Sequence, residues 1–559
     1  MVNVKNLFGM AVMATALVGC SSNDNLAPDG KDNAGKAGEA YASFTINLPT
    51  TSGTRADEPG TPSFAEGTDA EYEVKNGTIL IFDASTDKFV TSAELGTMNP
   101  WTKKTDENGV TTAAIATVQL HNVTVGGNYK ALVLLNNNFD AATKKVTLPT
   151  TTDTYATWSA DASKVNAEKY ASTDGIFMAN APKYIDTESQ PTTLVPIANV
   201  CASREEAQAK AATTVYVERG LAKVTMQDFT AGGYSIDAGT YAGGNVKIMN
   251  WQLDVTNKST FPVHQTGTLK TSWGQIWNTP RFYDGTNTAF KRVYWGVDPN
   301  YNKSEYQTLE NCKTAFNMIT NDKVVGVAGQ DKPQYCLENT FDLDNMKQGQ
   351  TTRVVFKAVF TPKDFTSGET FYKIGNNTAI WSKTNLETQI HTVAVTVMGI
   401  TDPDEQDKYV VKLNASTNNI SGEAGLHTIK PENIEYTGTG TSLVDANIDK
   451  INEKLGLTET GISTYLNGEA YYIARIKHFN ELTPWNAGEA YDSNNEKYLG
   501  RYGVLRNNWY DLSVNSISGL GYPDVPEVKP NMPDDENEQY INVEVKILDW
   551  AKRSQSIDL

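Results

Sequence analysis

The sequence predicts an all-β protein, and two observations lead to this prediction: the spacing of its apolar residues and the residue types of the same segments. Most segments with a regular pattern alternate apolar and polar residues with period two, as strands with one buried face do. The same segments are rich in Val, Ile, Thr, Tyr and Phe and end at Gly, Asn or Asp residues, which favour turns. No repeat with a period of about 20 to 50 residues is present, which disfavours solenoids and propellers.

In chain order, the first predicted strand covers residues 43–48, where Phe44, Ile46 and Leu48 take every second position. The other predicted strands cover residues 78–82, 129–135, 214–217, 222–226, 246–255, 353–360, 391–398, 409–413, 470–476 and 540–547.

Two short helices are expected among these strands. Ser442 can cap a helix that ends at Gly456 and carries one apolar face of Val444, Ile448, Ile451 and Leu455. Residues 203–212 are rich in Ala, Glu and Lys and predict a surface helix.

Composition and length limit the classes of protein that remain. The chain has 559 residues and a net charge of −18, so it lacks the basic surface that a nucleic-acid partner requires. Apolar residues make up 39% of the chain, enough for sizeable cores, and the length favours two to four domains or two large β domains. The Gly-rich stretch at 230–244 suggests a boundary between domains at 56–235 and 236–559.

Residues 1–20 have the features of a lipoprotein signal peptide. Lys5 precedes an apolar run at 7–18 that is too short for a stable membrane anchor, and the run ends in Leu-Val-Gly-Cys. We favour lipidation of Cys20 over an ordinary signal peptide in which this cysteine is incidental. Residues 21–40 then form a tether before the first strand, so 21–55 is predicted to be a tether plus a removable strand.

The linker after the first strand offers a cleavage site. Residues 49–63 are rich in Thr, Gly, Pro and Asp, and Arg55 is their only basic residue. A trypsin-like protease cuts most readily at such a position, between Arg55 and Ala56. On composition alone, an ordinary linker residue is the simpler interpretation of Arg55.

The C-terminus contains a second strand pattern that could be donated to another molecule. It follows an acidic, proline-containing spacer and carries alternating apolar residues: Ile541, Val543, Val545, Ile547 and, after a phase shift, Ile557 and Leu559. Such a tail can add to an open sheet edge of a neighbour. The alternative is that residues 540–550 form the last strand of their own sheet, and both can hold if only the end is donated.

No catalytic, metal or cofactor site is predicted. The five histidines lack metal-binding spacing, and the elbow and phosphate-loop motifs of hydrolases and nucleotide-binding proteins are missing from the sequence. The acidic group Asp402, Asp404 and Asp407 is interpreted as a solvated turn rather than a Ca²⁺ loop, because it lacks the EF-hand glycine and distal glutamate.

Three further pairs of residues have alternative interpretations. Glu218 and Arg219 could form a buried or interfacial ion pair, but a surface ion pair is favoured. Trp509 and Tyr510 are expected in a core rather than in a sugar-binding platform. Cys312 and Cys336 could form a disulfide or remain buried thiols, and the sequence leaves this open.

Four blocks together resemble the fimbrillins of Bacteroidales type V pili, of the minor-fimbrium stalk-subunit type. They are 215–224 (VYVERGLAKV), 335–340 (YCLENT), 501–510 (RYGVLRNNWY) and 514–517 (VNSI), in addition to Cys20 and Arg55. The resemblance covers nearly the whole chain, and the block at 501–510 is its most specific part.

This resemblance implies two transthyretin-like β-sandwich domains and export as an outer-membrane lipoprotein. It implies that an arginine-specific protease removes the lipidated first strand, and that the tail ending at Leu559 fills the groove of another copy in an extracellular pilus. Anchor and tip pilins would be further partners. The rival interpretation is a non-polymerising glycan-binding lipoprotein or a tip or anchor adhesin, which would need neither Arg55 nor a donated tail.

Overall fold

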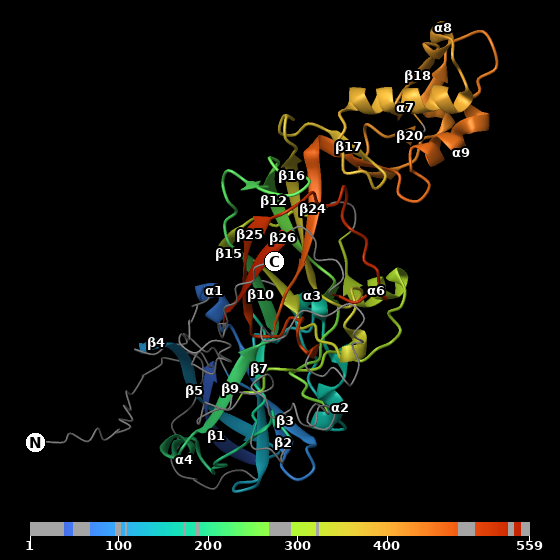
Figure 1. The fold of residues 1–559 in the computed structure, drawn as a ribbon. Coiled ribbons are helices and arrows are strands. Elements are labelled where there is room, and N and C mark those ends of the chain that lie inside the picture. The colour runs from blue at the N-terminus through green and yellow to red at the C-terminus, as the bar shows by residue number, and fades with distance from the viewer. Residues whose placement is uncertain are drawn as a thin grey trace, which may run out of the picture.

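The computed structural model describes residues 38–48, 68–95, 102–106, 109–170, 175–184, 190–267, 292–319, 323–416, 418–478, 498–534 and 541–548. Strands dominate these residues and helices are few and mostly short, which confirms the predicted all-β class (Figure 1). No helix among the described residues is long and apolar enough to cross a membrane.

The first part of the chain forms one nine-stranded sheet with the order β3-β2-β6-β7-β9-β1-β5-β4, in which β8 also pairs with β6. Its strands are β1 (Glu39–Leu48), β2 (Gly77–Asp83), β3 (Phe89–Glu94), β4 (Thr102–Asp106), β5 (Gly109–His121), β6 (Tyr129–Leu135), β7 (Met178–Asn180), β8 (Val195–Pro196) and β9 (Thr213–Arg219). Four short helices accompany it: α1 (Asp69–Tyr72), α2 (Tyr155–Ser159), α3 (Ala167–Tyr170) and α4 (Arg204–Ala209).

The chain passes from the first sheet to another sheet at Gly220, which joins β9 directly to β10 (Leu221–Met226). A Cβ atom at Gly220 would lie 2.3 Å from the Tyr170 hydroxyl, so this junction has no room for a side chain. The domain boundary expected near residue 235 stays a prediction, but β10 already belongs to a different sheet from β9.

Two four-stranded sheets form a second sandwich, with the orders β15-β10-β25-β26 and β11-β12-β16-β24. Apolar side chains from both sheets, including Val224, Trp251, Phe356 and Leu512, form one buried core between them. The elements of this part are β10 (Leu221–Met226), β11 (Tyr234–Ser235), β12 (Asn245–Asp254), β13 (Thr256–Asn257), α6 (Leu309–Ala315), β14 (Phe316–Asn317), β15 (Gly329–Leu337), β16 (Arg353–Thr361), β24 (Glu469–Arg475), β25 (Trp509–Ile517) and β26 (Ile541–Leu548).

A lobe is inserted between β16 and β24, which are neighbours in one sheet, and it projects from the sandwich at the top of Figure 1. It has its own buried core, to which Leu386, Ile390 and Ile451 contribute. Its elements are β17 (Phe371–Ile374), α7 (Lys383–Met398), α8 (Pro403–Gln406), β18 (Tyr409–Val411), β19 (Asn414–Ala415), β20 (Asn418–Asn419), β21 (Gly425–His427), β22 (Ile434–Tyr436), α9 (Val444–Lys454) and β23 (Ile462–Tyr465).

In one segment of the lobe the structure differs from the sequence prediction. The strand predicted at 391–398 is the C-terminal half of helix α7. Three buried residues at helical spacing, Leu386, Ile390 and Ala394, show the reason, because two of them lie before the segment that was interpreted as a strand. The helix begins after the capping residue Ser382 and ends at Gly399, whose φ of 70° suits a glycine.

Both predicted helices are present. Helix α9 covers most of the predicted segment, and the Ser442 hydroxyl accepts a hydrogen bond from the Val444 N–H at 3.2 Å. Helix α4 lies within the predicted segment 203–212, and Ser203 caps it.

Candidate functional site

Strand β1 lies inside the first sheet rather than at its edge (Figure 1). On one side it pairs antiparallel with β5 along its whole length, from Glu39 opposite His121 to Leu48 opposite Thr112. On the other side it runs parallel to β9, from Phe44 beside Thr213 to Asn47 beside Tyr216. Removal of β1 would therefore leave two strand edges without a partner.

One face of β1 is part of a hydrophobic core. Ala40, Ala42, Phe44 and Ile46 are fully buried there. They share this core with Ile79 and Ile81 of β2 and with residues of β6 and β9. Burial of a large apolar side chain contributes about 1.5 to 3 kcal/mol, so β1 contributes much of the stability of this sheet.

The other face of β1 is covered by helix α4. Ser43 is 7% exposed, and its hydroxyl donates to the Ala207 carbonyl at 2.8 Å. The Arg204 guanidinium lies 5.7 Å from the centre of the Tyr41 ring and donates to the Thr117 carbonyl of β5 at 3.0 Å. The sequence interpretation found α4 but not its place over β1, because nothing in the local sequence indicates which strand a surface helix covers.

The remaining predicted site residues are placed in part. Cys20, Arg55, Ala56, Ile557 and Leu559 lie outside the described residues. Leu48 ends β1, and its backbone pairs with Thr112. Four predicted donor residues, Ile541, Val543, Val545 and Ile547, lie on β26, which pairs antiparallel with β25 at the edge of its own sheet.

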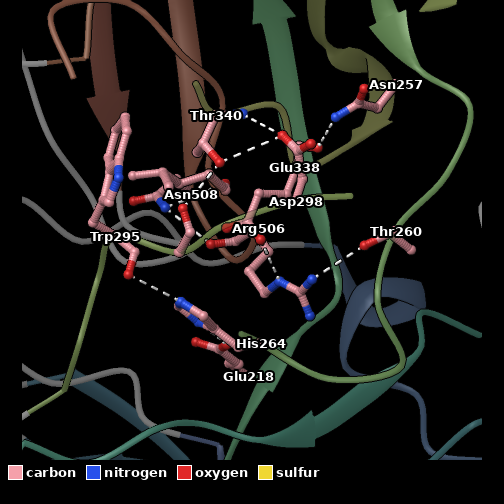
Figure 2. Close-up of polar contacts among 12 residues, drawn as sticks. Glu218, Asn257, Thr260, His264, Trp295, Asp298, Glu338, Thr340, Arg506 and Asn508 are labelled. Carbon is pink, nitrogen blue, oxygen red and sulfur yellow. Dashed lines mark hydrogen bonds and ion pairs between the residues drawn. The ribbon is translucent and has the colours of Figure 1, made fainter. Parts of the chain in front are cut away.

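A cluster of buried charged side chains lies where the first sheet meets the part of the chain that follows β9 (Figure 2). Glu218 at the end of β9 contacts His264 Nδ1 at 2.7 Å, and its second oxygen accepts from Arg292 Nη2 at 2.7 Å. Burial raises the pKa of Glu218, but the charges of His264 and Arg292 outweigh this and hold the pKa below its usual range. The carboxylate is therefore ionised inside the protein.

The block at 501–510 contributes the other half of this polar cluster. Arg506 Nε donates to Glu338 Oε2 at 3.1 Å, and Arg506 Nη2 donates to Thr260 at 3.1 Å. Asp298 is buried nearby and accepts backbone hydrogen bonds from Asn300 and Thr340, each at 2.6 Å. Burial raises the pKa of Asp298 to about 7.

The predicted surface ion pair between Glu218 and Arg219 is wrong. Both residues are buried, and they have different partners. Arg219 Nε donates to the Glu71 carbonyl at 3.2 Å. Alternation along β9 puts neighbouring side chains on opposite faces, so two adjacent charges on a strand rarely face each other.

A second charged cluster fastens helix α1 to the second sandwich. Lys223 Nζ of β10 lies 2.7 Å from Glu71 Oε1, and both side chains are at most 2% exposed. The Tyr335 hydroxyl donates to the same oxygen at 2.6 Å. Lys223 also lies 3.6 Å from the centre of the Trp509 ring, a cation–π contact.

The structure decides the alternative interpretations of Trp509 and Tyr510 and of the two cysteines Cys312 and Cys336. Trp509 and Tyr510 are 5% and 0% exposed, so they are core residues as predicted. Cys312 and Cys336 are buried free thiols, and burial raises their pKa values to about 11 and about 12. No group of three or more His, Cys, Asp or Glu side chains within the described ranges could hold a metal ion.

Comparison with known proteins gives a family match for the end of the chain. Residues 463–556 match the family model described as "Major fimbrial subunit protein type IV, Fimbrillin, C-terminal". This range includes β25, β26 and the polar block at 501–510. Comparison with curated protein sequences gives no match.

Several solved structures show a distant likeness. A Parabacteroides distasonis structure, described provisionally as a cell adhesion protein, is 11% identical over 93% of this chain and 99% of its own, with a TM-score of 0.38. A Bacteroides eggerthii structure with the same description is 11% identical over 94% and 100%, with a TM-score of 0.32. A fimbrial assembly protein from P. distasonis is 12% identical over 59% and 98%, with a TM-score of 0.23.

Proposed function

The chain is a fimbrillin-type protein, and from this premise we propose that it is a structural subunit of a cell-surface pilus that serves adhesion. We further propose that it is exported as a lipoprotein acylated at Cys20 and cleaved between Arg55 and Ala56. Other copies of the chain then fill the vacated groove by donor-strand exchange. The family match indicates a structural protein rather than an enzyme.

The observation that carries this proposal is the internal position of β1. A strand between β5 and β9 cannot leave without exposing a row of backbone groups on both neighbours and an apolar slot where Phe44 and Ile46 lay. Exposed strand edges bind other strands readily. Loss of β1 would thus convert a closed monomer into a molecule with one strong binding site.

The attachments on either side of Arg55 also support the proposal. β1 ends at residue 48 and α1 begins at residue 69, with Arg55 as the only basic residue between them. Glu71 anchors α1 through Lys223 and Tyr335. Cleavage after Arg55 would release the first strand, while the new N-terminal segment would stay attached to the sandwich.

The C-terminus provides a segment that can be donated. β26 is paired within its own chain as far as residue 548, and 11 residues follow it. These residues, which include Ile557 and Leu559, have an extended reach of about 36 Å. In this proposal the partners are other copies of the chain, anchor and tip pilins, an arginine-specific protease and, before cleavage, the outer membrane.

The test uses the secreted chain from Ser21 onward, treated with an arginine-specific protease. We expect a new N-terminus at Ala56 and a ladder of SDS-resistant oligomers on unheated gels. Arg55→Ala is the matched variant: because the arginine-specific protease cannot cut after residue 55, it should stay monomeric under the same treatment.

A single monomer band after complete cleavage at Arg55 would contradict strand exchange. It would favour the rival interpretation, a glycan-binding lipoprotein or a tip or anchor adhesin.

A further inference from the structure

One polar side chain is buried in the middle of β1. Ser43 is 7% exposed, and its single hydroxyl proton goes to the Ala207 carbonyl at 2.8 Å. The Thr117 hydroxyl of β5 lies 2.8 Å from the Ser43 hydroxyl oxygen. Because the Ser43 proton is already donated, Thr117 is the donor in this second bond. Ser43 thus links its sheet neighbour β5 to the helix that covers the strand.

The acceptor of this bond belongs to the last turn of α4. The final carbonyls of a helix lack intrahelical partners, and Ala207 is 1% exposed, so water has little access to its carbonyl. The Ser43 hydroxyl supplies a donor there. If β1 leaves, this buried carbonyl loses that donor, which is unfavourable unless the next strand restores it.

Helix α4 has a contact that does not depend on β1. The Arg204 guanidinium donates to the Thr117 carbonyl of β5, which stays in the sheet when β1 is removed. The Ala207 carbonyl would therefore remain over the open groove. An incoming strand would meet an apolar slot on one face and this acceptor on the other.

The chain contains one segment whose pattern fits both faces. Ser556-Ile557-Asp558-Leu559 repeats the order hydroxyl, apolar, polar, apolar of Ser43-Phe44-Thr45-Ile46. If Ile557 and Leu559 occupy the positions of Phe44 and Ile46, and the tail runs in the direction of β1, Ser556 falls where Ser43 was. A shift by two residues would put Ser554 there, but it would move Gln555 from the small position of Ala42 to that of Phe44. The larger slot would then hold no apolar side chain, which is unfavourable.

Building on the proposed function, we infer that the groove of one copy recognises the tail of a second copy through a single hydroxyl. The Ala207 carbonyl is the acceptor, Ser43 is its donor in the uncleaved chain, and Ser556 of the incoming tail is its donor in the polymer. This contact fixes the register and the direction of the tail in addition to the apolar residues Ile557 and Leu559.

The test compares two serine substitutions in the same tail, Ser556→Ala and the matched control Ser554→Ala, in the full secreted chain. Oligomers form after cleavage at Arg55, and excess labelled, cleaved chain then measures their dissociation rate by label uptake. We expect Ser556→Ala oligomers to dissociate about tenfold faster than wild type, which corresponds to about 1.4 kcal/mol. Ser554→Ala and the conservative variant Ser556→Thr should match wild type.

Other outcomes separate this inference from the proposed function. Equal dissociation rates for Ser556→Ala and wild type would overturn the hydroxyl contact and leave strand exchange standing. A weakening caused by Ser554→Ala instead would overturn the register. If the cleaved wild-type chain forms no oligomers, the proposed function fails and this inference fails with it.

Discussion

At the scale of single residues, the molecule contains several charged side chains that are buried and paired with opposite charges. Glu71, Lys223, Glu218 and Arg506 are all at most 2% exposed, and each has a partner of opposite charge within about 3 Å. Removing one member of such a pair leaves an uncompensated buried charge, which is strongly destabilising.

Glu71→Gln should destabilise the folded monomer by about 3 to 5 kcal/mol at pH 7, because Lys223 would lose the carboxylate that lies 2.7 Å from its ammonium group. Urea unfolding of the uncleaved chain measures this. Glu71→Gln combined with Lys223→Met should recover part of the loss. A loss as large in the double variant as in the single one would show that the charge pair is not the cause.

The pH dependence of this pair has a definite sign. Burial raises the pKa of Glu71, but Lys223 outweighs this and holds the pKa below its ordinary value of 4.5. The pair therefore contributes its stability above pH 4.5 and loses it as the pH falls through the lower folded pKa. The difference in unfolding free energy between wild type and Glu71→Gln should accordingly shrink as the pH falls below 4.5.

At the scale of elements, the proposed function gives β1 a different importance before and after cleavage. Phe44→Ala should lower the unfolding free energy of the uncleaved chain by about 3 to 5 kcal/mol, because it opens a cavity in a fully buried core. The same substitution should leave the cleaved polymer as stable as wild type, since the polymer no longer contains β1.

Ile79→Ala provides the control, because β2 stays in the protein and its core contact is needed in both states. It should weaken monomer and polymer alike, as measured by unfolding of the monomer and by thermal dissociation of the polymer on gels. A polymer weakened equally by Phe44→Ala would mean that β1 is retained.

The elements also show what sequence patterns can and cannot predict. Strands such as β2, β6 and β10 are predicted well because each is a short local run rich in the residue types that favour strands. Helix α7 was missed at 391–398 because its Val and Thr residues suggest a strand. In the structure, the Thr388, Thr392 and Thr396 hydroxyls donate to carbonyls four residues earlier, so they fit a helix.

Only the part of the candidate site that depends on a local sequence pattern could be predicted. The apolar face of β1 is visible in six consecutive residues. The Ser43 contact joins residues 164 positions apart, and the Arg506–Glu338 pair joins residues 168 positions apart. No local pattern encodes such distances, which is why Glu218 and Arg219 were wrongly assigned to the surface.

At the scale of the whole molecule, the two parts are expected to unfold together. One apolar cluster contains Leu80 and Trp158 of the first part and Leu337 and Trp509 of the second, and Glu218 of the first part pairs with His264 and Arg292 of the second. Wild type should therefore show a single calorimetric transition.

Glu218→Gln should lower the unfolding free energy by about 3 to 5 kcal/mol because it removes the buried charge that faces His264 and Arg292, and it should separate that transition into two. Arg204→Met, on the surface helix α4, is the control and should keep one transition. One unchanged transition in Glu218→Gln would show that the apolar cluster alone couples the parts.

The inserted lobe leaves the sandwich at β16 and returns at β24, two strands that lie side by side. In the proposed pilus, a pull from groove to tail would put no load on a segment that departs and returns at one place. Substitutions, insertions or bound molecules in this lobe would leave the tensile strength of the fibre unchanged.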